Sequence, residues 1–161
     1  MQEVAAHARE SGRIYLTGGA SAVLQHWRES TVDIDLKIVP ENDRILRALP
    51  ELKEKLHINV ELASPSDFVP ELPSWEDRSA FIAQHGPIAF HHYDFYSQAL
   101  SKLERGHRKD LADVDAMVRT GLVKPADLLA LFEQVTAKLY RYPAINADTL
   151  RSAVERFAAR G

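Results

Sequence analysis

The sequence predicts an α+β fold, in which a small mixed β-sheet is flanked by helices and followed by a helical C-terminal part. Two patterns predict this organisation. Short segments of alternating apolar and polar residues, bounded by Gly or Pro, occupy the first half of the chain. From Asp94 onward, apolar residues recur at helical spacing. We therefore expect an α/β core over residues 1–93 and a helical part over residues 94–161 that packs on the core.

Composition excludes several classes of protein. The chain has 161 residues, of which 45% are hydrophobic and 27% charged, as in ordinary globular proteins. It has no cysteine, which excludes disulfides and thiolate metal sites. The formal net charge of -3 gives no overall basic field for nucleic acid. No apolar run approaches the roughly 20 residues that cross a bilayer, and no apolar signal segment is visible, so we expect a cytoplasmic protein without membrane contact.

Four strands are expected in the core, at Ile14–Thr17, Val32–Val39, Ile58–Leu62 and Pro87–Tyr93. The second has the clearest pattern: its even-numbered residues are apolar, whereas Asp33, Asp35 and Lys37 are charged. Because successive side chains of a strand point to opposite faces, this strand has one buried and one charged face. The first strand ends at two glycines, which indicates a tight turn. The segment Glu76–Gln84 is expected to form a short helix or a strand.

Helices are expected at Ala20–Arg28, Asn42–Leu56, Phe95–Arg105, Arg108–Thr120, Pro125–Lys138 and Ala147–Ala159. Pro50 predicts a kink or break inside the second helix, because proline lacks the N–H that a helix interior needs. Gly121 fits a C-cap after the fourth, Pro125 fits a first helical turn, and Asn146 can cap the last. Three prolines make Ser64–Trp75 a loop or a set of turns.

The first candidate for a functional role is the turn Gly18-Gly19-Ala20-Ser21 between a strand and a helix. Glycines let the backbone turn sharply and approach a ligand closely. The N–H groups at the start of the next helix favour an anion such as phosphate, and Ser21 adds a hydroxyl. Such a turn is mostly structural when it stands alone. Phosphate binding by Gly18, Gly19 and Ser21 therefore depends on the other features of the core.

The second candidate is the pair Asp33 and Asp35, which share one face of a strand. Two acids side by side are unfavourable unless a cation lies between them. Mg²⁺ binds one or two carboxylates together with substrate phosphates, which makes the pair a candidate metal site. The alternative is a solvated strand face on which Lys37 is the ionic partner.

The third candidate is Glu61, an acid between apolar residues on the third strand. If this strand pairs with the second, Glu61 joins the face that carries Asp33 and Asp35. Three carboxylates on neighbouring strands can hold two metal ions about 4 Å apart. Glu61 can instead act as a base for an attacking hydroxyl, or it can be an exposed acid on an edge strand.

In combination, these features resemble the signature of the DNA polymerase β-like nucleotidyltransferases. The resemblance is carried by Leu16-Thr17-Gly18-Gly19-Ala20-Ser21, Asp33-Ile34-Asp35-Leu36 and Val60-Glu61-Leu62. It implies a nucleotidyltransferase core with an NTP as substrate and two Mg²⁺ ions. It places Gly18, Gly19 and Ser21 at the NTP phosphates. It makes Asp33 and Asp35 metal ligands and Glu61 the third carboxylate, at a position where the family usually has Asp.

Within that superfamily, the chain is most similar to bacterial AbiE-type toxins and related nucleotidyltransferases. The similarity is carried by Arg28-Glu29-Ser30-Thr31 and by the stretch Lys102–Asp113, which contains Lys-Leu-Glu-Arg and Asp-Leu-Ala-Asp. It implies that Lys102 contacts the NTP phosphates, that Asp110 is a further catalytic acid, and that Asp113 supports both. It also implies an antitoxin protein as a partner and tRNA as a target.

The same helical stretch has a second interpretation. Asp110 and Asp113 lie early in a helix, where acids interact favourably with the helix dipole, and the neighbouring cations can form a solvated basic turn. The histidines show no metal-ligand spacing, so His91 and His92 are expected to be structural or surface residues that point to opposite faces of a strand.

These residues predict transfer of a nucleoside monophosphate from an NTP to a hydroxyl of tRNA, a protein or a small molecule. Asp33, Asp35 and Glu61 would hold Mg²⁺, and Lys102 and Asp110 would complete the catalytic set. One rival is a catalytically inactive nucleotide- or partner-binding module of the same fold, against which the retention of both aspartates argues. Another is a DNA-binding regulator built on the helical part, against which the acidic net charge argues.

Overall fold

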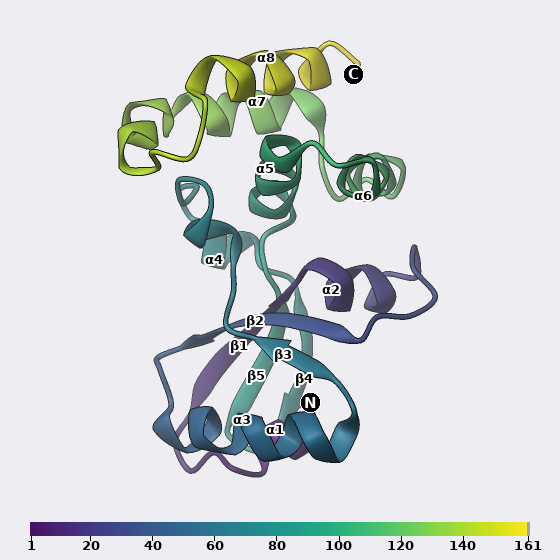
Figure 1. Ribbon diagram of the computed structural model, residues 1–161, viewed down its shortest axis with the longest axis vertical. Coiled ribbons are helices and arrows are strands. Elements are labelled where there is room, and N and C mark those ends of the chain that lie inside the picture. Colours follow the sequence, from purple (N-terminus) through teal and green to yellow (C-terminus); the bar gives the residue numbers. More distant parts are fainter. Residues whose placement is uncertain (161) are drawn as a thin grey trace. The chain divides into compact units, whose positions relative to one another are not determined.

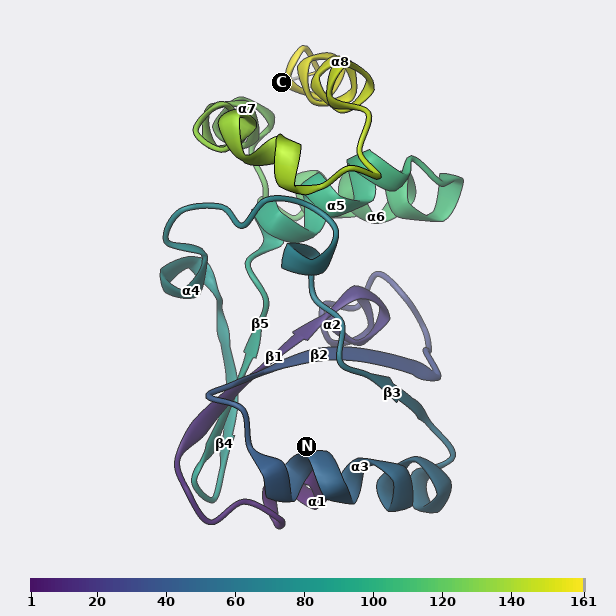
Figure 2. The same cartoon turned by 60° about the vertical axis from the view of Figure 1, so that its left-hand side comes forward.

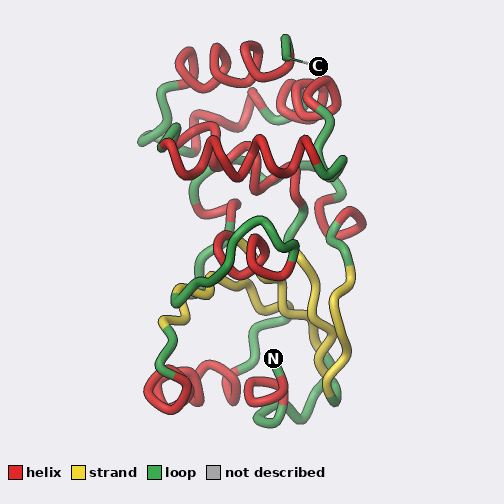
Figure 3. The backbone as a smooth tube through the Cα atoms, turned by 90° about the vertical axis from the view of Figure 1, so that its right-hand side faces the viewer, coloured by secondary structure: helices red, strands yellow, loops and turns green. Residues whose placement is uncertain are grey.

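The structure, a computed structural model, describes residues 1–160. The chain divides into two compact units, which are described separately here. The first unit consists of Met1–Ser64 and Ser79–Tyr93, and the second of Pro65–Arg78 together with the residues from Asp94 onward. The segment Pro65–Arg78 thus belongs with the C-terminal helices, although in sequence it lies between two strands of the sheet. Figure 3 shows that the described strands, in yellow, all lie in the first unit.

The first unit is built on a mixed five-stranded sheet with the order β3-β2-β1-β5-β4. Its strands are β1 (Gly12–Thr17), β2 (Asp33–Val39), β3 (Asn59–Glu61), β4 (Phe81–His85) and β5 (Ile88–His92). β1 pairs antiparallel with β2 and parallel with β5, β2 pairs parallel with β3, and β4 pairs antiparallel with β5. The predicted mixed sheet is confirmed, and the pairing of β2 with β3 is the one on which the position of Glu61 depends.

Helices cover one face of this sheet. They are α1 (Gln2–Ala5), α2 (Gly18–Leu24) and α3 (Asp43–Leu56). Figures 1 and 2 show α1 and α3 side by side on the same side of the sheet. The core beneath them is formed by buried apolar residues of β1, β2, β3, β5 and the three helices, among them Ile14, Leu36, Ile45, Leu52 and Phe90. Because side chains alternate along a strand, the acids of β2 lie on the opposite face.

Of the kink or break expected at Pro50, the break does not occur, because α3 runs from Asp43 to Leu56 as one helix with Pro50 inside it. Asn42 caps its N-terminus by accepting a hydrogen bond from the N–H of Ile45 (3.2 Å). Pro50 is exposed, whereas Leu49 and Leu52 on either side of it are buried in the core. Burial of the apolar face on both sides of the proline therefore outweighs the local cost of the missing hydrogen bond.

The second unit is helical. It contains α4 (Trp75–Arg78), α5 (Phe95–Arg105), α6 (Arg108–Arg119), α7 (Pro125–Glu133), α8 (Ala147–Ala158) and two 3-10 segments, η1 (Pro65–Asp67) and η2 (Thr136–Arg141). α5 packs against α6, α7 and α8, and α7 lies beside α8, as Figure 1 shows. Asp94 fixes the start of α5, since its carboxylate accepts from the N–H groups of Tyr96 and Ser97 and pairs with Arg78 at 2.9 Å.

Two predicted elements are divided in the structure. Glu76–Gln84 contains most of α4 and the first part of β4, so both of the expected alternatives occur. The helix expected at Pro125–Lys138 ends at Glu133 and is followed by the 3-10 segment η2. Among residues 1–160, no helix combines the length and the apolar character needed to cross a membrane.

Candidate active site

A glycine turn joins β1 to α2 and lies directly against an acid of β2. Gly18 has a φ of +58°, a conformation that L-residues with a side chain rarely adopt. A Cβ atom at this position would lie 2.8 Å from Oδ2 of Asp35. A side chain at position 18 would therefore be strained by the backbone conformation and would also displace the Asp35 carboxylate.

The next glycine, Gly19, lies against the segment that leads into β2. A Cβ atom there would lie 2.5 Å from Oγ1 of Thr31 and 3.5 Å from the carbonyl oxygen of Asp33. The Thr31 hydroxyl donates to the Asp33 carbonyl (3.0 Å) and accepts from the Asp33 N–H (3.2 Å). The start of β2, and with it Asp33, is thus held against the glycine turn.

Asp33 and Asp35 occupy one face of β2, as the sequence predicts. Asp35 is opposite Thr17 in the antiparallel register with β1, which explains why its carboxylate reaches Gly18 in the turn that follows. Asp33 is exposed and Asp35 is partly exposed, so both acids are accessible to water. Lys37 follows on the same face, with its Nζ 6.0 Å from the centre of the Tyr93 ring.

Glu61 lies beside the aspartates rather than away from them. In the parallel register of β2 and β3, Asp35 is opposite Glu61 and Asp33 is opposite Asn59. The amide of Asn59 donates to Oε1 of Glu61 (2.9 Å) and to Oδ1 of Asp33 (3.3 Å). The three acids therefore share one face of the sheet, and a neutral amide connects Glu61 to Asp33.

The donor groups on this face fit a divalent cation that is completed by substrate. Among residues 1–160, no three His, Cys, Asp or Glu side chains gather closely enough to form a metal cage. Asp33 and Asp35 nevertheless present two accessible carboxylates on one strand face. Mg²⁺ is typically held by one or two carboxylates with phosphate oxygens and water supplying the other ligands. Asp33 and Asp35 thus form an open pair of carboxylates rather than a closed metal cage.

Ser21 has a different environment from the one expected of a phosphate ligand. Its side chain is fully buried, and its hydroxyl donates to the carbonyl of Leu16 (2.9 Å). The same oxygen lies 3.0 Å from Nδ1 of His92, whose Nε2 lies 3.0 Å from the amide nitrogen of Gln25. Burial lowers the pKa of His92 to about 4, so its imidazole is neutral at physiological pH. In this structure the Ser21 hydroxyl connects the glycine turn to β5.

Lys102 and Asp110 lie in the second unit and form an ionic cluster with the buried Asp113 and the exposed Arg105. The ammonium of Lys102 lies 2.6 Å from Asp113 and 3.3 Å from Asp110, and Arg105 lies 2.7 Å from the same Asp110 oxygen. Lys102 is 4% exposed. The two acids thus compensate the charge of the lysine between α5 and α6. Its contact with NTP phosphate, and a catalytic role for Asp110, remain predictions.

Several contacts of this neighbourhood were not predicted from the sequence. Strand alternation places Asn59 on the same face as Glu61, but its hydrogen bonds to Glu61 and Asp33 were not expected. Thr31 also had a local signal, because a hydroxyl two residues before a strand residue often bonds to its backbone. His92 and Gln25 had none, since the contact of His92 with Ser21 spans 71 residues of sequence.

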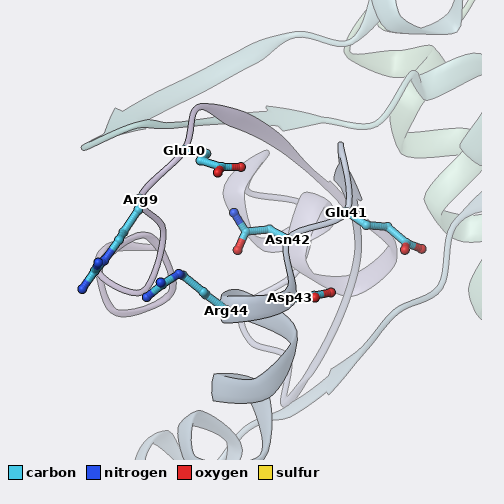
Figure 4. Close-up of a pocket in the computed structure, with 6 residues that line it drawn as sticks. All are labelled: Arg9, Glu10, Glu41, Asn42, Asp43 and Arg44. Carbon is cyan, nitrogen blue, oxygen red and sulfur yellow. The ribbon is translucent and has the colours of Figure 1, made fainter.

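A separate pocket of about 340 Å³ lies beyond the other end of β2. It is lined by Arg9, Glu10, Glu41, Asn42, Asp43 and Arg44. Figure 4 shows the side chains of Arg9 and Arg44 extending to one side and those of Glu41 and Asp43 to the other. Asp33 lies at the first residue of β2 and the pocket lies beyond the last, so the two are separated by the length of the strand, roughly 20 Å at the usual rise per residue. The pocket is therefore distinct from the acidic face.

Comparison with known proteins gives one match. The profile of a family described as "Nucleotidyltransferase of unknown function (DUF6036)" matches residues 1–159, nearly the whole chain. No curated protein and no solved structure matches.

Proposed function

Because the chain belongs to the DUF6036 family of nucleotidyltransferases of unknown function, we propose that it transfers a nucleoside monophosphate from an NTP to a hydroxyl acceptor with the aid of Mg²⁺. One observation carries this proposal: the carboxylate of Asp35 lies against Gly18, where a Cβ would be only 2.8 Å away. The acid proposed to bind metal therefore lies directly against the turn proposed to bind phosphate.

The residues of this face would have separate roles. Asp33 and Asp35 would hold Mg²⁺, which would lower the pKa of the attacking hydroxyl and neutralise charge on the phosphates. The triphosphate would lie beside the Gly18–Gly19 backbone, where it can share a ligand sphere with Asp35. Catalysis would then come from positioning and charge stabilisation, since phosphoryl transfer needs little covalent chemistry from the protein.

Glu61 is proposed as the acceptor of the proton. The Asn59 amide already lies between Glu61 and Asp33, which favours a base on the rim of the site over a third metal ligand. In the transfer, the acceptor oxygen forms a bond to the α-phosphorus and the bond from the α-phosphorus to the bridging oxygen breaks. Pyrophosphate leaves with that electron pair, and the hydroxyl proton passes to Glu61.

The proposal also covers which molecule accepts the nucleoside monophosphate and what biological role the transfer has. A hydroxyl acceptor is offered by a tRNA end, by Ser, Thr or Tyr of a protein, or by a small molecule. The AbiE-type resemblance of Lys102–Asp113 adds a toxin function with an antitoxin protein as partner. In that scheme, Lys102 contacts the NTP and Asp110 is a catalytic acid.

The test is incubation of the protein with α-labelled NTPs, Mg²⁺ and cell extract, followed by measurement of labelled products and pyrophosphate. Asp35→Asn should reduce both by 100-fold or more, roughly the cost of losing one charge-stabilising group in a site. Glu41→Gln is the matched control, because Glu41 is an exposed acid just beyond the far end of β2. Equal labelling by wild type and Asp35→Asn would refute the metal-binding role.

A second candidate is a nucleotide-binding module without catalysis. It is favoured by the finding that no group of three potential metal-ligating side chains occurs in the described part of the chain. A thermal shift with Mg²⁺ and NTP, without any release of pyrophosphate, would identify this function.

A further inference from the structure

The strongest feature that the proposed mechanism does not use is a buried chain of polar groups behind the glycine turn. It consists of Gln25, His92, Ser21 and the carbonyl of Leu16, joined by contacts of 3.0, 3.0 and 2.9 Å. Ser21 is 0% exposed and His92 is 4% exposed. Buried polar side chains are costly unless every member of the network is satisfied.

The hydrogen bonds of this chain have one consistent direction. The Ser21 hydroxyl gives its proton to the Leu16 carbonyl, so its oxygen accepts a proton from Nδ1 of His92. His92 is then the Nδ1–H tautomer, and its Nε2 accepts from the amide group of Gln25. The neutral imidazole is thus both a donor and an acceptor, and the low pKa that burial gives it agrees with this state.

The chain of groups surrounds the turn that the proposed function requires. Leu16 precedes Gly18 by two residues, and Ser21 follows Gly19 by two. The Leu16 carbonyl also accepts from the N–H of Tyr93 (2.8 Å), so it is held both from β5 and from α2. One end of the turn is therefore hydrogen-bonded to His92 through Ser21, and the other end is hydrogen-bonded to the backbone of Tyr93 through the Leu16 carbonyl.

We propose that His92 is a positioning residue for the NTP, because it fixes the Gly18–Gly19 turn through Ser21 at the place where Asp35 meets Gly18. This inference rests on the proposed function. The side chain of His92 contacts Ser21 and Gln25, and it would act on the nucleotide through the turn. A turn held in this way keeps the triphosphate site formed before the nucleotide arrives, which lowers the cost of binding.

Two substitutions separate positioning from simple stability. In His92→Asn, the side-chain amide can still donate to Ser21 from the place of Nδ1. In His92→Phe, an aromatic ring is kept but both side-chain hydrogen bonds, to Ser21 and to Gln25, are lost. Phe90→Leu is the matched control. Phe90 is a buried core residue of the same strand and is not part of the hydrogen-bonded series that contains Ser21, so this substitution changes packing alone.

Steady-state pyrophosphate release by the full-length protein is the first measurement. His92→Phe should raise the KM for NTP about tenfold, the equivalent of one lost interaction, while kcat changes less than about threefold. His92→Asn should restore the KM to within about threefold of wild type. An unchanged KM in His92→Phe overturns the inference, and so does an equal rise in all three variants, which would reflect stability alone.

Amide hydrogen exchange of the nucleotide-free protein is the second measurement, and it does not depend on activity. His92→Phe should speed exchange at Ser21 and Ala22, the first α2 amides with helical hydrogen bonds back to the turn, whereas His92→Asn and Phe90→Leu should not. If the wild type released no pyrophosphate, the proposed function would fail, and the exchange rates would still decide whether His92 holds the turn. Equal exchange rates in wild type and His92→Phe would show that His92 does not hold the turn.

Discussion

At position 18, two separate constraints act on one residue. The backbone has a φ of +58°, and the carboxylate of Asp35 occupies the space that a side chain would need. The first constraint also applies to Gly86, which has a φ of +53° but nothing within 4 Å of the place of a Cβ. Substitution of Gly86 therefore measures the backbone strain alone, whereas substitution of Gly18 measures the strain together with the displacement of Asp35.

Gly18→Ala and Gly86→Ala should each lower the free energy of unfolding by about 1–2 kcal/mol, because a side chain is strained in the left-handed conformation. Only Gly18→Ala should also abolish pyrophosphate release, since its Cβ pushes the Asp35 carboxylate from its place. Urea unfolding and the activity assay measure the two effects. An active Gly18→Ala protein would show that the contact with Asp35 is dispensable.

His92 gives the stability of the protein a pH dependence. Its pKa is lowered from 6.5 to about 4 by burial, so between these values the unfolded chain binds a proton that the folded chain does not. The free energy of unfolding therefore falls as pH drops from 6.5 towards 4, by at most about 1.4 kcal/mol per pH unit for this one group. Urea unfolding at pH 7 and pH 5 should show a smaller difference in His92→Asn than in wild type. An equal difference would place the pH dependence on other groups.

At the scale of elements, α5 and α6 are joined by buried charges as well as by apolar packing. Lys102 lies between Asp110 and Asp113 with 4% of its surface exposed. Removal of one partner from a buried ion pair leaves an uncompensated charge, which is far more costly than loss of an exposed pair. The stability of this helix pair should therefore depend on Lys102.

Lys102→Met should lower the free energy of unfolding by about 3 kcal/mol, because it removes the cation that lies between two buried carboxylates, of which Asp110 keeps only its pair with Arg105. Lys109→Met is the control, since Lys109 is exposed at the start of α6 and should change stability by less than about 0.5 kcal/mol. Urea unfolding measures both. Identical midpoints for Lys102→Met and wild type would mean that the cluster contributes nothing to stability.

The elements that were predictable from sequence are those with a local pattern. The alternation of β2 placed Asp33 and Asp35 on one face. The helix expected at Phe95–Arg105 has these bounds in the structure, with Asp94 as its N-cap and Gly106 as its C-cap. Pro50 does not break its helix, because the local cost of proline is outweighed by burial of the apolar residues on either side of it. The pairing of His92 with Ser21 was not predictable, since neither residue carries a local signal for a contact so distant in sequence.

At the scale of the whole molecule, the features that carry the proposed chemistry are unevenly distributed. The glycine turn, both aspartates and Glu61 lie in the unit that contains the sheet, whereas the residues suggested by the AbiE-type resemblance lie in the helical unit. The family profile covers both units. We therefore expect the first unit to hold the nucleotide and its metal on the face of β2 opposite α1 and α3.

The most direct measurement is paramagnetic broadening of backbone amide signals by Mn²⁺ bound with a non-hydrolysable NTP analogue. The broadening should be strongest at Gly18, Gly19 and Asp33–Asp35, and much weaker at Arg44, because the effect falls steeply with distance and Arg44 lies beyond the far end of β2. Asp35→Asn should remove it. Strongest broadening at Arg44, or a pattern unchanged in Asp35→Asn, would show that the nucleotide and its metal do not bind at the acids of β2.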